Sequence, residues 1–234
     1  QEALSHHNYV TLTPIQSAAL PLALSGRDVT GQAKTGSGKT AAFGLALLNQ
    51  IDDTLAKTQA LVLCPTRELA DQVAAELRRL SQRMHRTRIL TVCGGQPYHD
   101  QKMGLKKGCH VVVGTPGRVG NHLQKGHLEV EALSVLVLDE ADRILDMGFI
   151  EQVTDIVQRC PNRRQTLLFS ATFPKAMTRL CATIQTDAAF VSVDAQVDQA
   201  ILQQQVVRCA PGVRNQTLVQ VLAHHRPEQA LVFC

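Results

Sequence analysis

The sequence has no apolar run that approaches the roughly 20 residues needed to cross a membrane as a helix, and it shows no internal repeat or low-complexity stretch. We therefore expect no membrane partner. Hydrophobic residues make up 44% of the chain and charged residues 19%, which is typical of a folded globular protein and not of a disordered one. The 234 residues suffice for one large domain, or for one and a half ordinary ones.

The cysteines and histidines lack the spacing of a disulfide framework or a metal site. The seven cysteines include no Cys-x-x-Cys pair, and the nine histidines show no ligand spacing. Several cysteines lie within apolar, strand-like runs, where a free cysteine behaves as a small buried hydrophobe. We therefore expect no zinc site and a reducing, cytoplasmic compartment.

The net charge of +4 is mild, so it permits an anionic partner without requiring one. Basic residues cluster at 78–88 and at 102–107. Solvated helix faces are the better interpretation of both clusters, and we assign no binding site to them.

Short apolar runs alternate with stretches of helical periodicity. Between the second and third runs, for example, Leu69, Val73, Leu77 and Leu80 recur at helical spacing. Such alternation predicts an α/β fold whose mostly parallel sheet is covered by helices on both faces. Strands are predicted near residues 28–32, 60–64, 89–93, 111–114, 135–139, 165–170 and 190–193.

The pattern changes after residue 193. Residues 194–199 are polar and aperiodic, which is typical of a linker. Segments 204–209, 213–223 and 230–234 then predict a strand, a helix and a strand. We expect a first domain at residues 1–195, a linker at 196–203 and the truncated start of a second α/β domain at 204–234. Since Gln1 is not an initiator Met, we expect the chain to lie within a longer protein.

A segment rich in Gly, Ser and Thr follows the first predicted strand and precedes a helix. Glycines in such a loop let backbone N–H groups close around the phosphates of a nucleotide. Lys39 would add a positive charge, and the Thr40 hydroxyl is placed to ligate Mg²⁺. The alternative is a plain surface loop, and Ala33 stands where the general motif has its first Gly. The segment consists of Ala33, Lys34, Thr35, Gly36, Ser37, Gly38, Lys39 and Thr40.

Three carboxylates within four residues follow the apolar run 135–138. Asp139, Glu140 and Asp142 would repel one another unless a cation lies between them, and Mg²⁺ on a nucleotide is the obvious candidate. Asp139 is the expected acidic partner of the metal. Glu140 is the expected base or orienting group for an attacking water. The alternative is an acidic loop that starts a helix, because Asp and Glu favour helix N-termini.

These two segments resemble the DEAD-box ATP-dependent RNA helicases, and further segments agree in order and spacing along essentially the whole chain. Thr13-Pro14-Ile15-Gln16 resembles the family's glutamine motif, in which Gln16 would read the adenine edge with Tyr9 nearby as an aromatic surface. The segments that resemble the family's RNA-contacting motifs are Pro65, Thr66 and Arg67, then Gly94 and Gly95, then Thr115, Pro116, Gly117 and Arg118.

Ser170, Ala171 and Thr172 resemble the family motif that hydrogen-bonds to Asp142 and couples the nucleotide state to the grip on RNA. The RNA segments each follow a predicted strand, so their amides, hydroxyls and arginines can line one edge of the sheet and hold a phosphate backbone. A helix cap that contains Pro is the alternative for the Pro65 and Thr115 segments. A tight turn is the alternative for Gly94-Gly95.

Some positions depart from the family pattern. Asn8 stands where the family usually has Gly, and Leu12 stands where it usually has Pro. An aromatic residue that helps to hold adenine in the family would lie before Gln1. Gly120 falls early in a predicted helix and should weaken it by about 0.5–1 kcal/mol relative to Ala if it is interior. Gly94–Pro97, Cys64-Pro65 and Asp71-Gln72-Val73 resemble the bacterial DbpA branch.

The resemblance implies a RecA-like P-loop NTPase domain that binds ATP with Mg²⁺ and single-stranded RNA through its backbone. In the intact protein, ATP binding and hydrolysis would drive local unwinding of RNA duplexes, and the DbpA-like branch suggests ribosomal RNA and ribosome biogenesis. The family's catalytic arginines come from the second domain, beyond Cys234. We therefore expect this chain alone to hydrolyse ATP very slowly and not to unwind RNA.

The sequence leaves two other classes of protein open. A different P-loop enzyme, such as a GTPase or a transporter ATPase, is disfavoured by Gln16. A non-catalytic, nucleotide-gated clamp is disfavoured by the presence of Lys39, Asp139 and Glu140.

Overall fold

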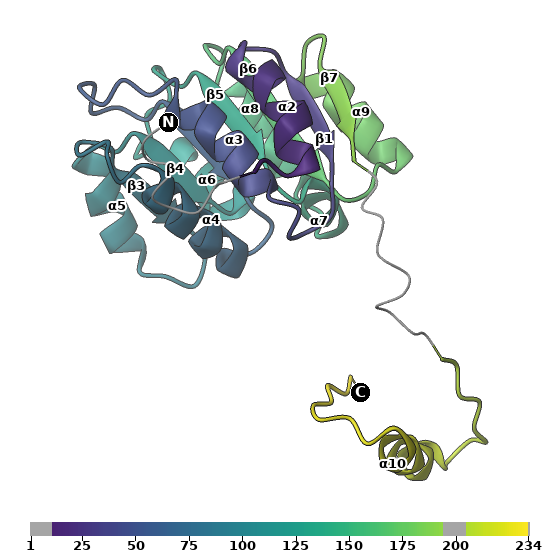
Figure 1. The fold of residues 1–234 in the computed structure, drawn as a ribbon. Coiled ribbons are helices and arrows are strands. Elements are labelled where there is room, and N and C mark those ends of the chain that lie inside the picture. The colour runs from purple at the N-terminus through teal and green to yellow at the C-terminus, as the bar shows by residue number, and fades with distance from the viewer. Residues whose placement is uncertain (1–10, 194–204, 234) are drawn as a thin grey trace. The chain divides into compact units, whose positions relative to one another are not determined.

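The computed structural model describes residues 11–193 and 205–233. The chain separates into two compact units, residues 1–195 and 196–234. In the first unit, parallel strands form one seven-stranded sheet in the order β3-β4-β2-β5-β6-β1-β7 (Figure 1). The strands are β1 (Val29–Gln32), β2 (Ala60–Leu63), β3 (Ile89–Val92), β4 (Val111–Gly114), β5 (Val135–Leu138), β6 (Gln165–Ser170) and β7 (Ala189–Ser192).

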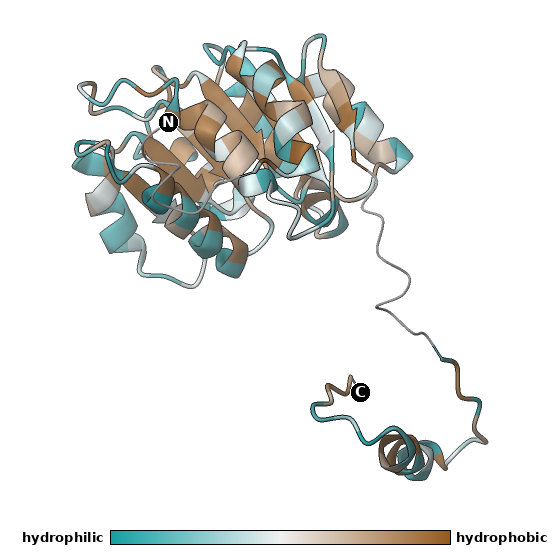
Figure 2. Ribbon diagram, in the orientation of Figure 1, coloured by the Kyte–Doolittle hydropathy of each residue, from teal (hydrophilic) through white to brown (hydrophobic). Residues whose placement is uncertain are grey.

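Helices cover both faces of the sheet. Helices α2, α3 and α4 share one hydrophobic core with one set of strand side chains, and α5 to α9 share a second core with the alternate set. Figure 2 shows the hydrophobic residues concentrated in the strands and on the inner sides of the helices. The helices are α2 (Pro14–Leu24), α3 (Lys39–Leu48), α4 (Arg67–Leu80), α5 (Tyr98–Lys106), α6 (Pro116–Gln124), α7 (Ala141–Asp146), α8 (Ile150–Gln158) and α9 (Lys175–Ile184).

The central strands are apolar on both faces because both faces are covered. Every residue of β2, β4, β5 and β6 is buried, as expected for strands in the middle of a parallel sheet. Leu61 and Val62 illustrate this, since they are neighbours in β2 but belong to opposite cores. The expected α/β fold is confirmed, and the seven strands lie within one residue of their predicted bounds.

Local sequence fixes the helix that follows β2. Thr66 caps α4, and its hydroxyl oxygen accepts a hydrogen bond from the Leu69 N–H at 3.3 Å. Val73, Leu77 and Leu80 lie on the buried side of the helix. Burying one such side chain contributes about 1.5–3 kcal/mol, so the predicted helical spacing accounts for the way α4 covers the sheet.

The strand order divides the loops at the carboxyl ends of the strands into two neighbouring groups. Strands β5, β6 and β1 are adjacent, and they lead into Asp139, the Ser170 segment and Ala33. Strands β3, β4 and β2 are also adjacent, and they lead into Gly94, Thr115 and Pro65. Helix α7 follows β5 directly and lies at the lower end of the sheet in Figure 1, so the carboxyl ends point down in that view.

In the second unit, the described residues contain one helix, α10 (Arg214–His225), which confirms the helix predicted at 213–223. The strands predicted at 204–209 and 230–234 are wrong for the described residues, because 205–210 and 229–233 form no strand. A strand needs a hydrogen-bonded neighbour. Val206 and Phe233 are instead 89% and 88% exposed. The predicted linker at 196–203 lies outside the described residues.

Candidate functional site

The glycine loop, residues 33–38, joins β1 to α3. Its first residue is tied to β6, because the Ala33 N–H donates to the Ser170 carbonyl at 3.0 Å. Gly36 and Gly38 have φ values of 82° and 89°, in the left-handed region that favours glycine. Lys34 and Thr35 are exposed, and α3 begins at Lys39 immediately after the loop. The loop therefore presents a helix N-terminus, which attracts anions.

Gln16 joins the start of α2 to this loop. Its Oε1 accepts from the Thr13 N–H at 3.0 Å, and its Nε2 donates to the Gly38 carbonyl at 3.0 Å. Gln16 is only 3% exposed. Each end of the amide already has a protein partner, so one N–H and one acceptor position remain for a ligand. Leu12 is exposed, whereas Tyr9 and Asn8 lie outside the described residues.

Lys39 and Asp139 form a buried ion pair beneath the glycine loop. Lys39 Nζ lies 3.2 Å from Asp139 Oδ1, and the side chains are 5% and 0% exposed. Burial raises the pKa of the Asp139 carboxyl, and Lys39 offsets only part of that effect. In the described residues, three buried polar atoms without a hydrogen-bond partner gather here: Ser37 Oγ, Lys39 Nζ and Asp139 Oδ2. Such orphaned groups are costly unless a ligand satisfies them.

Glu140 sits in a constrained position next to Asp139. Its φ of 49° and ψ of 53° are left-handed, which is uncommon for a residue other than glycine. Its Oε1 accepts from Thr35 Oγ1 at 3.1 Å, and its Oε2 accepts from Arg143 Nη1 at 2.8 Å. The side chain is 6% exposed. These contacts hold the carboxylate beside the glycine loop, at the start of α7.

Asp142 is linked to the loop that follows β6. Its Oδ2 accepts from the N–H and the hydroxyl of Thr172, both at 3.0 Å. Its own N–H donates to Ser170 Oγ at 3.1 Å, and that hydroxyl donates to the Thr172 carbonyl at 2.8 Å. Burial alone would raise the pKa of Asp142, but the hydrogen bonds from Thr172 lower it overall. The structure thus joins β5 to β6 through the predicted coupling residues, with Ala171 half-buried between them.

A cavity of about 390 Å³ opens beside these groups. It is lined by Thr35, Gly36, Gly38, Lys39, Thr40, Ala41, Leu69, Gln72, Val73, Glu76, Asp139 and Glu140. The described residues contain no group of three or more His, Cys, Asp or Glu side chains that could hold a metal ion by themselves. Thr40 and the free Asp139 Oδ2 fit a Mg²⁺ ion that takes its remaining ligands from nucleotide phosphates and water.

The second group of predicted residues lies at the ends of β2, β3 and β4. Arg67 and Gly95 come together, because a Cβ built on Gly95 would lie 3.8 Å from Arg67 Nη1. Arg67 is half-exposed and lies 3.6 Å from Asp71. Thr115 is fixed to β3, since its N–H donates to the Val92 carbonyl at 3.2 Å. Pro65 and Pro116 are buried, whereas Gly94 and Gly117 are exposed.

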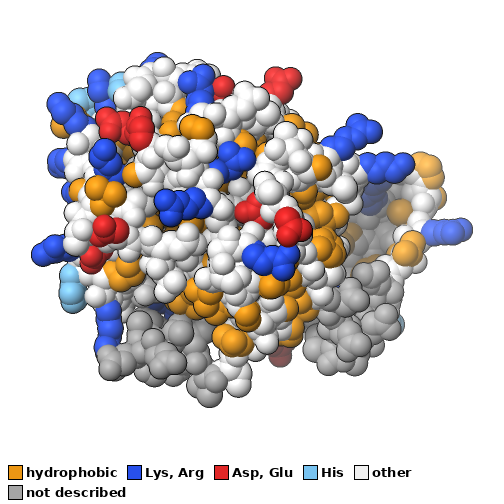
Figure 3. Space-filling view, turned by 90° about the horizontal axis from the view of Figure 1, so that it is seen from above, with side chains coloured by type: hydrophobic (Ala, Val, Ile, Leu, Met, Phe, Trp, Pro, Cys, Tyr) orange, Lys and Arg blue, Asp and Glu red, His pale blue; other side chains and the backbone are white. Residues whose placement is uncertain are grey.

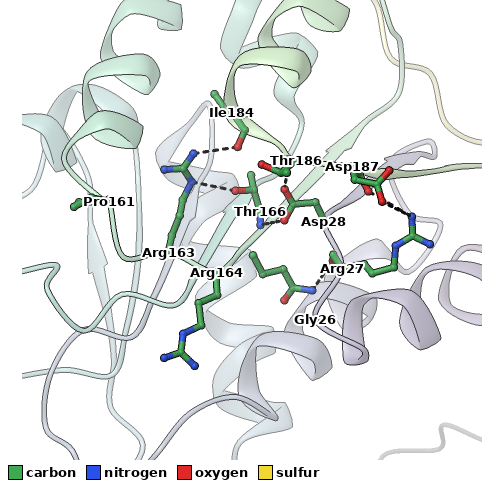
Figure 4. Close-up of a pocket in the computed structure, with 11 residues that line it drawn as sticks. Gly26, Arg27, Asp28, Pro161, Arg163, Arg164, Thr166, Ile184, Thr186 and Asp187 are labelled. Carbon is green, nitrogen blue, oxygen red and sulfur yellow. Dashed lines mark hydrogen bonds and ion pairs between the residues drawn. The ribbon is translucent and has the colours of Figure 1, made fainter.

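A separate cavity of about 400 Å³ lies at the amino ends of β1 and β6 (Figure 4). Several of its polar groups are hydrogen-bonded to one another. The Asp28 carboxylate accepts from the Thr166 N–H at 2.6 Å and from the Thr186 N–H at 2.7 Å. Arg163 donates to Thr166 Oγ1 and to the Ile184 carbonyl. These contacts join the strand starts to the loop before β7, so we interpret this cavity as structural.

Charge at that end of the molecule is mixed. Figure 3 views the first unit from above, which is the end where the strands begin. Lys and Arg side chains are spread over this face with Asp and Glu side chains among them, so no single basic surface gathers there. We find no reason to place a polyanion on this face.

Two sets of contacts were missed from the sequence. Arg143 binds Glu140 from one helical turn away, a spacing that could have been found by eye. Tyr98 and Gln101 of α5 contact Arg118 of α6, and Gln101 also contacts His122 of α6. Because these contacts join two different helices, no local pattern indicates them. No helix among the described residues is long and apolar enough to cross a membrane.

Curated proteins that are similar to this chain include two bacterial ATP-dependent RNA helicases. The ATP-dependent RNA helicase DbpA of Escherichia coli (strain K12) is 51% identical over 231 residues, which cover 99% of this chain and 50% of that protein. The ATP-dependent RNA helicase DeaD of Klebsiella pneumoniae is 45% identical over 233 residues, covering 99% of this chain and 36% of that protein. The chain thus spans about half the length of these curated relatives, or less.

Solved structures that are similar to this chain include proteins of the same kind. A DEAD box protein from the hyperthermophile Methanococcus jannaschii superposes with a TM-score of 0.76 at 33% identity, covering 94% of this chain and 60% of that one. A hypothetical ATP-dependent RNA helicase from Sulfolobus tokodaii gives 0.76 at 30% identity, covering 95% and 70%. The family model described as DEAD/DEAH box helicase matches residues 13–180. The chain therefore belongs to the DEAD/DEAH box helicase family.

Proposed function

We propose that this chain is the nucleotide-binding half of an ATP-dependent RNA helicase, and that it binds ATP with Mg²⁺ and the backbone of single-stranded RNA. The observation that carries the proposal is the buried Lys39–Asp139 pair beneath the glycine loop, with Asp139 Oδ2 left without a partner. Lys39 is paired with Asp139 but has N–H donors to spare, and Asp139 Oδ2 has no partner, so the site suits a ligand that carries both phosphate and metal.

The nucleotide roles follow from position. Lys34 to Gly38 would surround the phosphates, and Lys39 would place its charge against them. Thr40 and Asp139 would hold Mg²⁺, which offsets the charge that develops on the phosphates. Glu140 is the candidate for orienting or deprotonating the attacking water, and Thr35 and Arg143 hold its carboxylate. Gln16 keeps one N–H and one acceptor position for the adenine edge.

The residues proposed to bind RNA lie in the loops and helix starts that follow β2, β3 and β4. The residues are Pro65, Thr66, Arg67, Gly94, Gly95, Thr115, Pro116, Gly117 and Arg118. They follow three adjacent strands, β2, β3 and β4, so they form one side of the sheet edge while the nucleotide loops form the other. Arginine, hydroxyl and backbone amide groups hold a phosphate backbone without reading its sequence.

Asp142 is the proposed coupling point between the two groups. Asp142 lies two residues after Glu140, and it is hydrogen-bonded to Ser170 at the end of β6 and to Thr172 in the loop that follows. A shift of α7 that accompanies nucleotide binding would therefore reach this loop directly.

The activity of the whole protein needs more than this chain. We propose that residues 196–203 form a linker and that residues 204–234 open a second RecA-like domain, whose remaining part would act in cis. An arginine from such a domain can raise the rate of phosphoryl transfer about 10³–10⁵-fold. The chain alone should therefore bind Mg·ATP, hydrolyse it very slowly and not unwind RNA.

We further propose a DbpA-like role in the cytoplasm, with ribosomal RNA as the partner and ribosome biogenesis as the process. The support is the 51% identity to the Escherichia coli DbpA helicase. An RNA target of this kind would be tested by crosslinking the intact protein to total cellular RNA and sequencing the bound fragments.

Turnover measurements test the main proposal. Phosphate release by this chain should be barely above background, with or without single-stranded RNA, while a fluorescent ATP analogue binds in the presence of Mg²⁺. Brisk, RNA-stimulated hydrolysis would contradict the dependence on a second domain. A preference for guanine over adenine nucleotides would instead favour a different class of P-loop enzyme.

A further inference from the structure

Arg118, at the start of α6, is held by groups that come from other parts of the fold. Its Nη1 donates to the Gln96 carbonyl and to Gln101 Oε1, both at 3.2 Å. Its guanidinium carbon lies 5.4 Å from the centre of the Tyr98 ring, within the range of a cation–π contact. A long exposed arginine would sample many rotamers, whereas these contacts hold this one in place.

Gln101 is the hub of this arrangement. It is 4% exposed, and its Nε2 donates to the Cys93 carbonyl at 2.8 Å. Its amide group is therefore oriented with Oε1 as the acceptor for Arg118. The same Oε1 lies 3.3 Å from His122 Nε2. Cys93 directly precedes Gly94, so Gln101 ties Arg118 to the loop that carries Gly94 and Gly95.

Tyr98 and His122 close the arrangement from the side. The two rings stack with centroids 4.3 Å apart and an interplanar angle of 5°. The Tyr98 hydroxyl is paired with His127 Nδ1 at 3.0 Å. His122 is fully buried, and burial lowers its pKa to about 4, so the ring is neutral at pH 7. A neutral His122 can donate its Nε2–H to Gln101 without adding a charge that would repel Arg118.

One edge of the guanidinium stays available. Both hydrogen bonds use Nη1, and among the described residues the Nε and Nη2 groups of Arg118 have no hydrogen-bond partner. A guanidinium presents its donors as a rigid fork that matches two phosphate oxygens. Contacts within the protein therefore use Nη1 of Arg118 and leave Nε and Nη2 to bind an anion.

We propose that Gln101 is a positioning residue for RNA binding: it orients Arg118 toward the RNA backbone, with Tyr98 as the supporting surface. This inference rests on the proposed RNA role of Arg118. The Arg118 side chain loses its conformational entropy when the protein folds, so RNA binding does not have to order it. Loss of the contact should weaken RNA binding about three- to tenfold without changing the nucleotide site.

The test measures the affinity of the 234-residue chain for a fluorescently labelled single-stranded oligouridylate at low salt, by fluorescence anisotropy. The variants are Gln101→Met, Arg118→Ala and the double variant. Gln158→Met is the matched control, because Gln158 is exposed on α8. Circular dichroism and the affinity for a Mg²⁺-bound ATP analogue establish that each variant is folded with an intact nucleotide site.

A double-mutant cycle separates positioning from a general loss of structure. We expect Gln101→Met and Arg118→Ala each to weaken RNA binding, and we expect the double variant to bind like Arg118→Ala alone. Equal losses from Gln101→Met with and without Arg118 would overturn the positioning role. So would wild-type affinity in the Gln101→Met variant. Wild-type affinity in Arg118→Ala would contradict the proposed RNA role itself, which is a different result.

A second pair of variants keeps the inference testable if Gln101→Met fails to fold. Tyr98→Phe retains the ring beside Arg118 and loses only the hydroxyl that pairs with His127, so it should bind RNA more tightly than a variant without the ring. Tyr98→Leu removes the ring and should weaken binding, with the loss again absent in the Arg118→Ala background. Equal affinities for the Phe and Leu variants would overturn the part assigned to Tyr98.

Discussion

Lys39 Nζ lies 3.2 Å from Asp139 Oδ1, and water reaches almost no part of either side chain. The two residues are far apart in sequence, and each would carry an uncompensated buried charge without the other. Their pairing explains how a site built to receive anionic phosphate and a cation can fold before either ligand binds.

Removing one member of this pair should cost stability. We predict that Lys39→Met lowers the free energy of unfolding by about 3 kcal/mol, because it leaves Asp139 buried without its counter-ion. Urea denaturation followed by circular dichroism measures the change.

The matched variant is Lys39→Met combined with Asp139→Asn, which removes both charges. It should recover most of the lost stability, although it should not bind Mg·ATP. Equal stability of the wild type and Lys39→Met would show that Asp139 does not depend on Lys39 in the folded protein.

The link between Asp142 and Thr172 predicts a change in acid stability. The folded state lowers the pKa of Asp142 below its usual 3.8. Its contribution to stability is therefore complete above pH 3.8 and is lost as the pH falls through the folded pKa. Thr172→Val removes the side-chain hydrogen bond, so it should raise this pKa and move acid unfolding to a higher pH.

Thr172→Ser is the control, because it keeps the hydroxyl group. Carboxyl chemical shifts measured by NMR across an acid titration give the pKa directly. An unchanged Asp142 pKa in Thr172→Val would mean that other groups stabilise the carboxylate.

The pH dependence expected from His122 has a different cause. Hydrogen bonds favour the charged form of Asp142, whereas burial disfavours the charged form of His122. Burial lowers its pKa from the usual 6.5 to about 4. Between these values the unfolded chain binds a proton that the folded chain does not, so stability should rise as the pH rises from about 4 to 6.5. His122→Phe keeps a ring against Tyr98 and cannot titrate.

The free energy of unfolding of His122→Phe should therefore vary less with pH than that of the wild type over this window. Urea denaturation at several pH values measures both slopes. Parallel pH profiles for the two proteins would contradict a neutral, buried His122.

The sequence was sufficient for the seven strands of the sheet and for placing the glycine loop beside the acidic segment, because both depend on local patterns. Runs such as 135–138 are apolar throughout, and a carboxylate that follows such a strand can be placed at the sheet edge. The surroundings of Arg118 could not be predicted, because Gln101 and Tyr98 approach it through the packing of α5 against α6. The bond from Gln16 to the Gly38 carbonyl was missed because it joins residues far apart in sequence, whereas the capping box of Thr13 and Gln16 is a local pattern that could have been found.

The strands expected at 204–209 and 230–234 illustrate a different limit. Their composition suits a strand, but a strand also needs neighbours, and the described residues around them provide none. Composition indicates where a strand can form, whereas pairing decides whether it does.

Gly120 offers a stabilising substitution. It lies within α6, and a Cβ built on it meets no atom within 4 Å. Gly120→Ala should raise the free energy of unfolding by about 0.5–1 kcal/mol.

Gly38→Ala is the contrasting variant. Gly38 has a φ of 89°, and an added Cβ would lie 2.6 Å from Gln16 Nε2. This variant should lose both stability and nucleotide affinity. Thermal denaturation of the two variants side by side tests the pair, and a destabilised Gly120→Ala would contradict the open space around that residue.

The central claim is that Lys39, Thr40 and Asp139 form a site for Mg·ATP. Isothermal titration calorimetry with a non-hydrolysable ATP analogue tests it most directly, in Mg²⁺ and in EDTA, for the wild type and for Asp139→Asn. We predict that the wild type binds more tightly in Mg²⁺ than in EDTA, and that Asp139→Asn loses this difference while staying folded. Equal affinity of both proteins under both conditions would contradict the claim.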